Sequence, residues 1–311
     1  MYQRYFGLSE QPFPISPDPR FLYLSESHKE ALAHMIYGFR EQKGFTVITG
    51  DVGTGKTTII NRFLAGFLDD TVKVVSVKNP DLDREDFFLT ISRQLGLEAA
   101  TGKAAFLAAL ERYLIESHER GRRVLLIVDE AQNLPPRLLE EIRLLSNIET
   151  ASRKLLQIML VGQQELNAKL MQPSLRQLRQ RITQKFHIVP LRLDETSEYI
   201  HHRLGVAGHG GGRLFGASAI RRIHDFSGGY PRLINVVCDA LLLAAYAKET
   251  DRVEAALVKE VTRGMEAAYV STTAPARRRI RRELFKACYG LVALVAIIFL
   301  FVLYRTGTPG W

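Results

Sequence analysis

The stretch that decides the fold is Gly50–Thr58, "GDVGTGKTT", which directly follows the apolar run "FTVIT" at residues 45–49. Two of its glycines and its Lys-Thr pair have the spacing G-x-x-x-x-G-K-[ST]. Glycines allow the backbone to turn back on itself, so that successive N–H groups point inward at a phosphate. The residues that follow, 57–68, have the apolar spacing of a helix, whose N-terminus favours anions. A buried strand, a glycine-rich turn and a helix in this order predict a nucleotide-binding loop.

Side chains of this loop have predicted contacts of their own. Lys56 is expected to reach the β- and γ-phosphates, and the Thr57 hydroxyl is expected to take a coordination position on Mg²⁺. The predicted nucleotide-binding residues are Gly50, Asp51, Val52, Gly53, Thr54, Gly55, Lys56, Thr57 and Thr58.

A pair of acids forms the second half of the predicted site. In "RVLLIVDEAQ", an apolar strand ends in Asp129 and Glu130. Side chains at the carboxyl end of a strand in a parallel sheet project into the ligand crevice. Asp129 is expected to hold Mg²⁺, directly or through water, and Glu130 to polarise an attacking water. The two motifs together predict hydrolysis of a nucleotide rather than binding alone.

The positive charge of the chain gathers near its C-terminus. The formal net charge is +9, and residues 276–311, with seven basic and one acidic residue, carry +6 of it. Within them, residues 287–304 ("ACYGLVALVAIIFLFVLY") contain no charge and are long enough to cross a bilayer. Six basic residues precede this run and one follows it, so the positive-inside rule places the large N-terminal part in the cytoplasm. The basic cluster also suits anionic lipid head groups.

The order of elements predicts the architecture. Strands alternate with helices as far as about Pro190, which favours a parallel α/β sheet with helices on both faces, and the pattern is helical thereafter. The expected organisation is an N-terminal extension (1–40), a phosphate-loop core (41–190), a small all-helical lid (191–269), a basic linker (270–286), a transmembrane helix (287–304) and a short periplasmic tail (305–311).

Arginines in two places fit roles in phosphate chemistry. Arg176, Arg179 and Arg181 come just before the predicted strand "KFHIVPL", and Arg232 lies early in a helix of the predicted lid. An arginine before the last core strand can reach the γ-phosphate bound to a neighbouring subunit, and a lid arginine can reach the same phosphate within its own chain. Both would stabilise the charge that develops in the transition state.

Seven segments in order carry a resemblance to a known family. They are "FGLSEQPFPISPDPRFLYLSESHKEALAHMIYGF", "GDVGTGKTT", "VDEAQNL", "LVGQQEL", "LRQRI", "LDETSEYIHHRL" and "SGGYPRLINVVCDALLLA". Over residues 1 to about 268 the chain resembles an AAA+ ATPase, and more narrowly the ExeA family (general secretion pathway protein A), with its relatives in pilus, exosortase and transposition systems. The resemblance implies that Gln163 is the sensor at the end of the fourth core strand, Arg181 the arginine finger and Arg232 the lid sensor. Arg179 competes with Arg181 for the finger role.

The resemblance also implies a function. It is that of an ATPase that uses ATP and Mg²⁺, forms a homo-oligomeric ring, and is anchored in the bacterial inner membrane. It would drive assembly or remodelling of envelope-machine proteins in secretion, pilus formation or exopolysaccharide export. An AAA+ regulator that binds nucleic acid, akin to transposition ATPases, and a scaffold that binds ATP without turnover remain alternatives. Secretion members continue past the membrane helix into a domain that binds peptidoglycan, and that role is not carried over.

Overall fold

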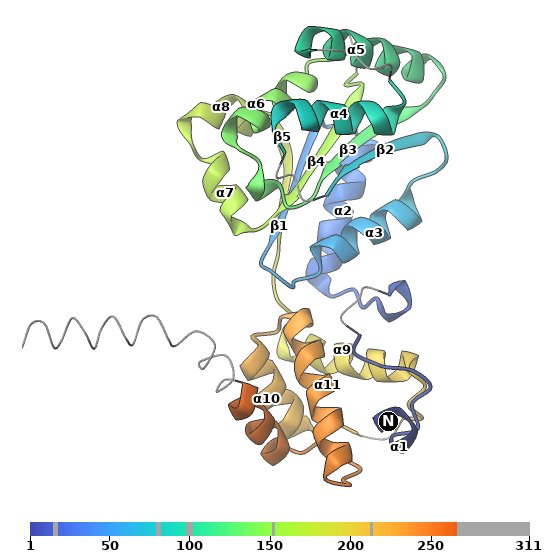
Figure 1. Cartoon of the computed structure of the whole chain (residues 1–311), viewed down its shortest axis with the longest axis vertical. Coiled ribbons are helices and arrows are strands. Elements are labelled where there is room, and N and C mark those ends of the chain that lie inside the picture. Colours follow the sequence, from blue (N-terminus) through green and yellow to red (C-terminus); the bar gives the residue numbers. More distant parts are fainter. Residues whose placement is uncertain (15–17, 79–81, 98–101, 151–152, 212–213, 266–311) are drawn as a thin grey trace, which may run out of the picture. The chain divides into compact units, whose positions relative to one another are not determined.

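Five parallel strands form the central sheet (Figure 1). They are β1 (Phe45–Gly50), β2 (Val72–Val77), β3 (Arg123–Val128), β4 (Leu156–Gly162) and β5 (Ile182–Ile188), in the spatial order β2-β3-β4-β1-β5. The inner strands β3, β4 and β1 are almost wholly buried, whereas the edge strands β2 and β5 are partly exposed. Near-continuous apolar runs are what a parallel strand covered on both faces requires. The predicted parallel α/β sheet is confirmed.

The computed structural model describes residues 1–14, 18–78, 82–97, 102–150, 153–211 and 214–265. The described residues as far as Ala255 belong to one compact unit. Within the described part of the chain, no helix combines the length and the apolar character needed to cross a bilayer. The expected transmembrane helix at 287–304 lies outside the described residues.

Helices cover both faces of the sheet, and the alternation of side chains along β3 shows how. Val124 and Leu126 pack into a cluster with α4 (Arg84–Leu95), α5 (Lys103–Glu119) and α6 (Pro136–Leu145). The intervening Leu125 and Ile127 pack with two helices on the opposite face. These are α2 (Glu26–Arg40) and α3 (Lys56–Phe67) (Figure 1).

The strand order determines where the predicted site residues meet. The phosphate loop leaves the carboxyl end of β1, Gln163 follows β4, and Asp129 follows β3. Because β1, β4 and β3 are consecutive neighbours in the sheet, these three strand ends lie in a row along one edge. Two short helices before β5 were not predicted, because seven and six residues show too little periodicity. They are α7 (Gln164–Leu170) and α8 (Arg176–Arg181).

After β5 the chain is helical, with α9 (Leu193–Val206), α10 (Ala217–Ser227) and α11 (Pro231–Ala247). The first residues of the chain pack on these helices rather than on the sheet. In α1 (Tyr2–Tyr5), the Tyr2 hydroxyl donates to Asp239 Oδ1 of α11 at 2.5 Å. Farther along, the Phe13 ring meets Phe215 edge to face. The N-terminal extension therefore contacts the helical part first and reaches the sheet only with α2.

Candidate functional site

The phosphate loop has the backbone that its glycines predict. Gly53 and Gly55 adopt φ values of 84° and 92°, which side-chain-bearing residues rarely adopt. A Cβ at Gly55 would lie 3.0 Å from Nε2 of His28, and a Cβ at Gly53 would lie 3.0 Å from Cβ of Arg232. A side chain at either position would therefore be strained by the backbone conformation and would need its neighbour to shift.

Lys56, the first residue of α3, lies under this loop. Its Nζ donates to the carbonyl oxygens of Gly50 at 2.9 Å and Asp51 at 3.0 Å. Only 7% of the residue is exposed. Burial lowers the pKa of Lys56, and the nearby carboxylates of Glu130 and Asp129 oppose that shift. A buried ammonium held by two neutral carbonyls is suited to an anionic ligand.

Thr57 and Asp129 meet across the edge of the sheet. The Thr57 hydroxyl donates to Asp129 Oδ2 at 3.1 Å, and the backbone N–H of Glu130 donates to Oδ1 at 2.9 Å. Burial raises the pKa of Asp129, and the two hydrogen bonds oppose that shift. A hydroxyl beside a buried carboxylate is a pair of hard oxygen donors, which is the chemistry that Mg²⁺ prefers.

Glu130 lies in a network of amides. Its Oε2 accepts hydrogen bonds from Nε2 of Gln132 at 2.5 Å and from Nε2 of Gln163 at 3.1 Å. Gln132 Oε1 in turn accepts from the backbone N–H of Gln163 at 2.9 Å. Burial alone would raise the pKa of Glu130, but these hydrogen bonds and the charge of Lys56 outweigh it and leave that pKa below its usual value. The carboxylate is thus held ionised.

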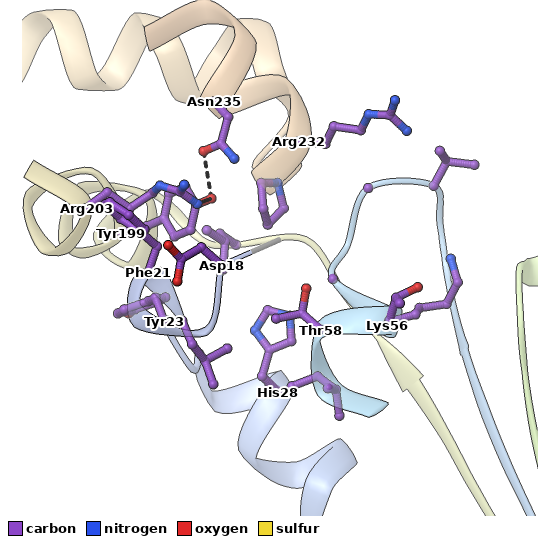
Figure 2. A pocket seen from close by; sticks show the side chains of 18 of the residues that line it. Asp18, Phe21, Tyr23, His28, Lys56, Thr58, Tyr199, Arg203, Arg232 and Asn235 are labelled. Carbon is purple, nitrogen blue, oxygen red and sulfur yellow. Dashed lines mark hydrogen bonds between the residues drawn. The ribbon is translucent and has the colours of Figure 1, made fainter. Parts of the chain in front are cut away.

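A pocket of about 450 Å³ opens above the loop. Its lining includes nine of the predicted residues: Val52, Gly53, Gly55, Lys56, Thr57, Thr58, Glu130 and Gln163 from the core, and Arg232 from α11. The remaining wall comes from the segment before α2 and from helices α9 and α11. In Figure 2, Lys56 at the start of α3 and Arg232 at the start of α11 come from different walls of this pocket. Gly50, Asp51, Thr54 and Asp129 support the loop without lining the pocket.

The far wall contains residues that the sequence did not single out. The Tyr199 hydroxyl donates to Asn235 Oδ1 at 2.7 Å (Figure 2). Arg203, 7% exposed, donates to the Tyr199 hydroxyl at 2.9 Å and lies 4.9 Å from the centre of the Phe21 ring. The sequence signal for these residues was the four-residue spacing of Tyr199 and Arg203, which places both on one face of a helix. That spacing does not show that this face lines the pocket.

His28 was missed as well. Its Nε2 donates to the carbonyl of Thr54 at 2.8 Å, and Ser25 Oγ accepts from the His28 backbone N–H at 3.3 Å in a capping box. Burial lowers the pKa of His28, so the ring is held neutral. This side chain connects the start of α2 to the phosphate loop.

The two candidate finger arginines lie elsewhere. Arg181 Nη1 donates to the Ser146 hydroxyl at 2.8 Å, at the end of α6. Arg179 Nη1 donates to the carbonyls of Leu170 at 3.3 Å and Met171 at 3.2 Å. Neither residue lines the pocket that holds the phosphate loop. Within one chain, the structure therefore brings the loop, the acids, Gln163 and Arg232 together, and leaves Arg181 outside.

These residues fit ATP and Mg²⁺. The glycine positions of the loop leave the space that a Cβ would fill, the buried Lys56 supplies a cation, and Thr57 with Asp129 supplies oxygen donors. The pocket volume suits a ligand of nucleotide size.

Known proteins are similar to this chain in sequence. Residues 40–170 match a family described as an AAA domain. Over 255 residues the chain is 44% identical to General secretion pathway protein A of Aeromonas hydrophila, covering 81% of this chain and 46% of that protein. The chain thus spans about half the length of that relative.

Solved structures share the fold at low sequence identity. Cdc6p from Pyrobaculum aerophilum is 20% identical with a TM-score of 0.59, covering 76% of this chain and 68% of that one. The Drosophila ORC bound to DNA is 20% identical with a TM-score of 0.61, covering 88% and 68%. The RuvB Holliday junction branch migration motor of Thermotoga maritima is 17% identical with a TM-score of 0.51, covering 82% and 73%. The domain match, the sheet order and the extended identity agree: residues 40–170 belong to the AAA domain family, and over 255 residues the chain is similar to general secretion pathway protein A.

Proposed function

We propose that this chain binds ATP and hydrolyses it to ADP and phosphate. The observation that carries the proposal is the row of strand ends. One pocket is lined by Lys56 and Thr57 after β1, by Glu130 after β3 and by Gln163 after β4. The Thr57 hydroxyl donates a hydrogen bond to Asp129. A site that only binds a nucleotide would need the phosphate loop alone. The acid pair, a buried Asp129 beside a partly exposed Glu130, is the additional feature that hydrolysis requires.

The residues divide the work. The loop N–H groups, Lys56 and Arg232 hold the triphosphate and neutralise the charge that grows as the γ-phosphoryl group leaves. Glu130 accepts the proton of the water that attacks phosphorus, and Gln163 orients the Glu130 carboxylate. Thr57 and Asp129 would hold Mg²⁺, and that ion would supply further charge neutralisation on the phosphate oxygens. Arg181, which lies outside its own pocket, serves the site of a neighbouring subunit.

The proposed cellular role is assembly or remodelling of a bacterial envelope machine by a ring anchored in the inner membrane. The relative named General secretion pathway protein A supports this role. So do the uncharged run at 287–304 and the basic residues before it. The proposed domain bounds, with a core at 41–190 and a lid at 191–269, belong to the same proposal. Membrane fractionation of the intact chain beside residues 1–270 tests the anchor, and an intact chain that stays in the soluble fraction would contradict it.

The enzymatic proposal is tested by separating binding from turnover. Lys56→Ala should abolish ATP binding, measured by calorimetry or by a fluorescent nucleotide. Glu130→Gln should bind ATP but hydrolyse it at least about 10²-fold more slowly, because the general base is lost. Lys73→Ala and Glu116→Gln, on exposed positions of β2 and α5, are matched controls and should change neither property. Normal turnover by Glu130→Gln would refute the assignment of the base.

A further inference from the structure

Asp51 places an acid inside the phosphate loop, next to the position of the ligand's negative charges. The backbone carbonyl oxygen of Asp51 accepts hydrogen bonds from Lys56 Nζ at 3.0 Å and from the Thr54 hydroxyl at 2.8 Å. Its carboxylate Oδ2 accepts a hydrogen bond from the hydroxyl of Tyr230 at 2.8 Å. The two residues are 179 positions apart in the chain, so the bond joins two distant segments.

Tyr230 comes from the turn between α10 and α11, and this turn packs closely against Leu191. Gly228 and Gly229 have φ values of 58° and 76°. A Cβ at Gly229 would lie 2.1 Å from the carbonyl oxygen of Leu191, and the Leu191 N–H donates to the Gly229 carbonyl at 2.9 Å. Tyr230 also precedes Pro231, the first residue of α11. The contacts of Gly229 with Leu191 therefore fix the position of the turn that carries the Tyr230 hydroxyl.

The same turn contacts the phosphate loop a second time. The backbone N–H of Arg232 donates to the carbonyl oxygen of Gly53 at 3.4 Å. A Cβ at Gly53 would lie only 3.0 Å from the Cβ of Arg232. The two contacts flank Val52, which is 58% exposed. Because Pro231, Arg232 and Asn235 line the pocket from one side and the loop lines it from the other, a nucleotide in this pocket would lie between them. A contact that joins the two walls would therefore hinder its release.

We infer that the Tyr230–Asp51 hydrogen bond is a latch between the α10–α11 turn and the phosphate loop, and that these two positioning residues slow nucleotide release. The inference rests on the proposed nucleotide binding and assigns neither residue to the chemical step. The hydroxyl donor also draws the Asp51 carboxylate toward the turn, which limits its repulsion of the phosphates. Hydrogen bonding to Asp51 raises the pKa of Tyr230, so the hydroxyl remains a donor at neutral pH.

The test is the dissociation rate of fluorescent ADP, measured by stopped flow on the intact chain. Tyr230→Phe and Asp51→Ala should each speed release by about 5- to 10-fold, the scale of one lost hydrogen bond. The double variant should be no faster than either single one, because both remove the same bond. Asp51→Asn keeps an oxygen acceptor for the hydroxyl, so its release should be slower than that of Asp51→Ala.

Tyr2→Phe is the matched control. It removes another Tyr–Asp hydrogen bond to α11, the one to Asp239, and lies outside the pocket, so release should be unchanged. Additive effects of the two substitutions, or release at the wild-type rate in both, would overturn the latch. A wild-type chain that binds no nucleotide would overturn the proposed function as well, so the two failures are told apart by the first measurement.

Discussion

Glu130 combines a strained backbone with a doubly bonded carboxylate. Its φ of 54° is uncommon for a residue with a side chain, and such conformations persist where the surroundings hold them. The amides of Gln132 and Gln163 both donate to Oε2 and keep the carboxylate ionised. The ionisation of Glu130 therefore depends on these hydrogen bonds as well as on the residue being a glutamate.

The pH dependence of turnover follows from that environment. Gln132→Ala removes one of the hydrogen bonds that lower the pKa of Glu130, so the carboxylate should take up a proton at higher pH. The acidic limb of kcat plotted against pH should therefore shift toward neutral pH, by the order of one pH unit. The measurement is ATP turnover from about pH 5 to 8. Gln94→Ala, which removes amide hydrogen bonds to Ser76 far from the pocket, is the control. An unmoved acidic limb would show that Gln132 does not set this pKa.

At the scale of elements, α2 does two jobs. Its apolar side chains, among them Met35 and Phe39, pack on the sheet with α3. Its first turn supports the phosphate loop through His28 and the Thr54 carbonyl. A helix packed on the sheet is thereby joined to the phosphate loop.

Stability should depend on pH through His28. Burial lowers the pKa of His28 in the folded chain, so below about pH 6.5 the unfolded chain binds this proton more readily than the folded one does. The free energy of unfolding should therefore fall as the pH drops through that value. In His28→Asn this component is absent, and the fall should be smaller, while the variant is less stable at neutral pH because the bond to Thr54 is lost.

Thermal unfolding from about pH 5 to 7.5 measures this effect. His118→Asn on α5 is the control and should follow the wild-type pH dependence. The same slope in His28→Asn as in the wild type would contradict a neutral, buried ring at the start of α2.

At the scale of the whole molecule, one chain does not contain a complete predicted site. Arg181 is bonded to Ser146 and lies outside the lining of the pocket, although its predicted role is at the γ-phosphate. Under the proposed finger role, an arginine so placed would act on the nucleotide of another subunit. Catalysis would then require association of subunits.

Mixing variants tests this sharing. Arg181→Ala should lower turnover by about 10³-fold or more while ATP binding survives, because the loop and Lys56 make the binding contacts. Combining Arg181→Ala with Lys56→Ala chains should restore part of the activity, since each supplies what the other lacks. Arg179→Ala is the comparison that separates the two candidate fingers. Turnover that is independent of protein concentration, with no rescue in the mixture, would make Arg181 a surface residue.

The sequence by itself determined the local parts of this protein. Residues 50–58 and the Asp129–Glu130 pair could be recognised because covalent spacing and glycine conformation define a phosphate loop before any packing occurs. The alternation of predicted strands with predicted helices along the chain likewise predicted the parallel sheet. Roles for Gln163, Arg181 and Arg232 came from the family resemblance and stay predictions.

Tertiary structure alone decided how distant segments complete the pocket. His28 meets Thr54 across 26 positions, and Tyr230 meets Asp51 across 179. Gln132 was visible in "VDEAQ", yet its bond to Glu130 depends on the left-handed turn that follows β3. A hydrogen bond needs its donor and acceptor within about 3 Å and well aligned. That geometry is determined only when helices from both ends of the chain pack around the sheet edge, because residue spacing carries no information about which faces will meet.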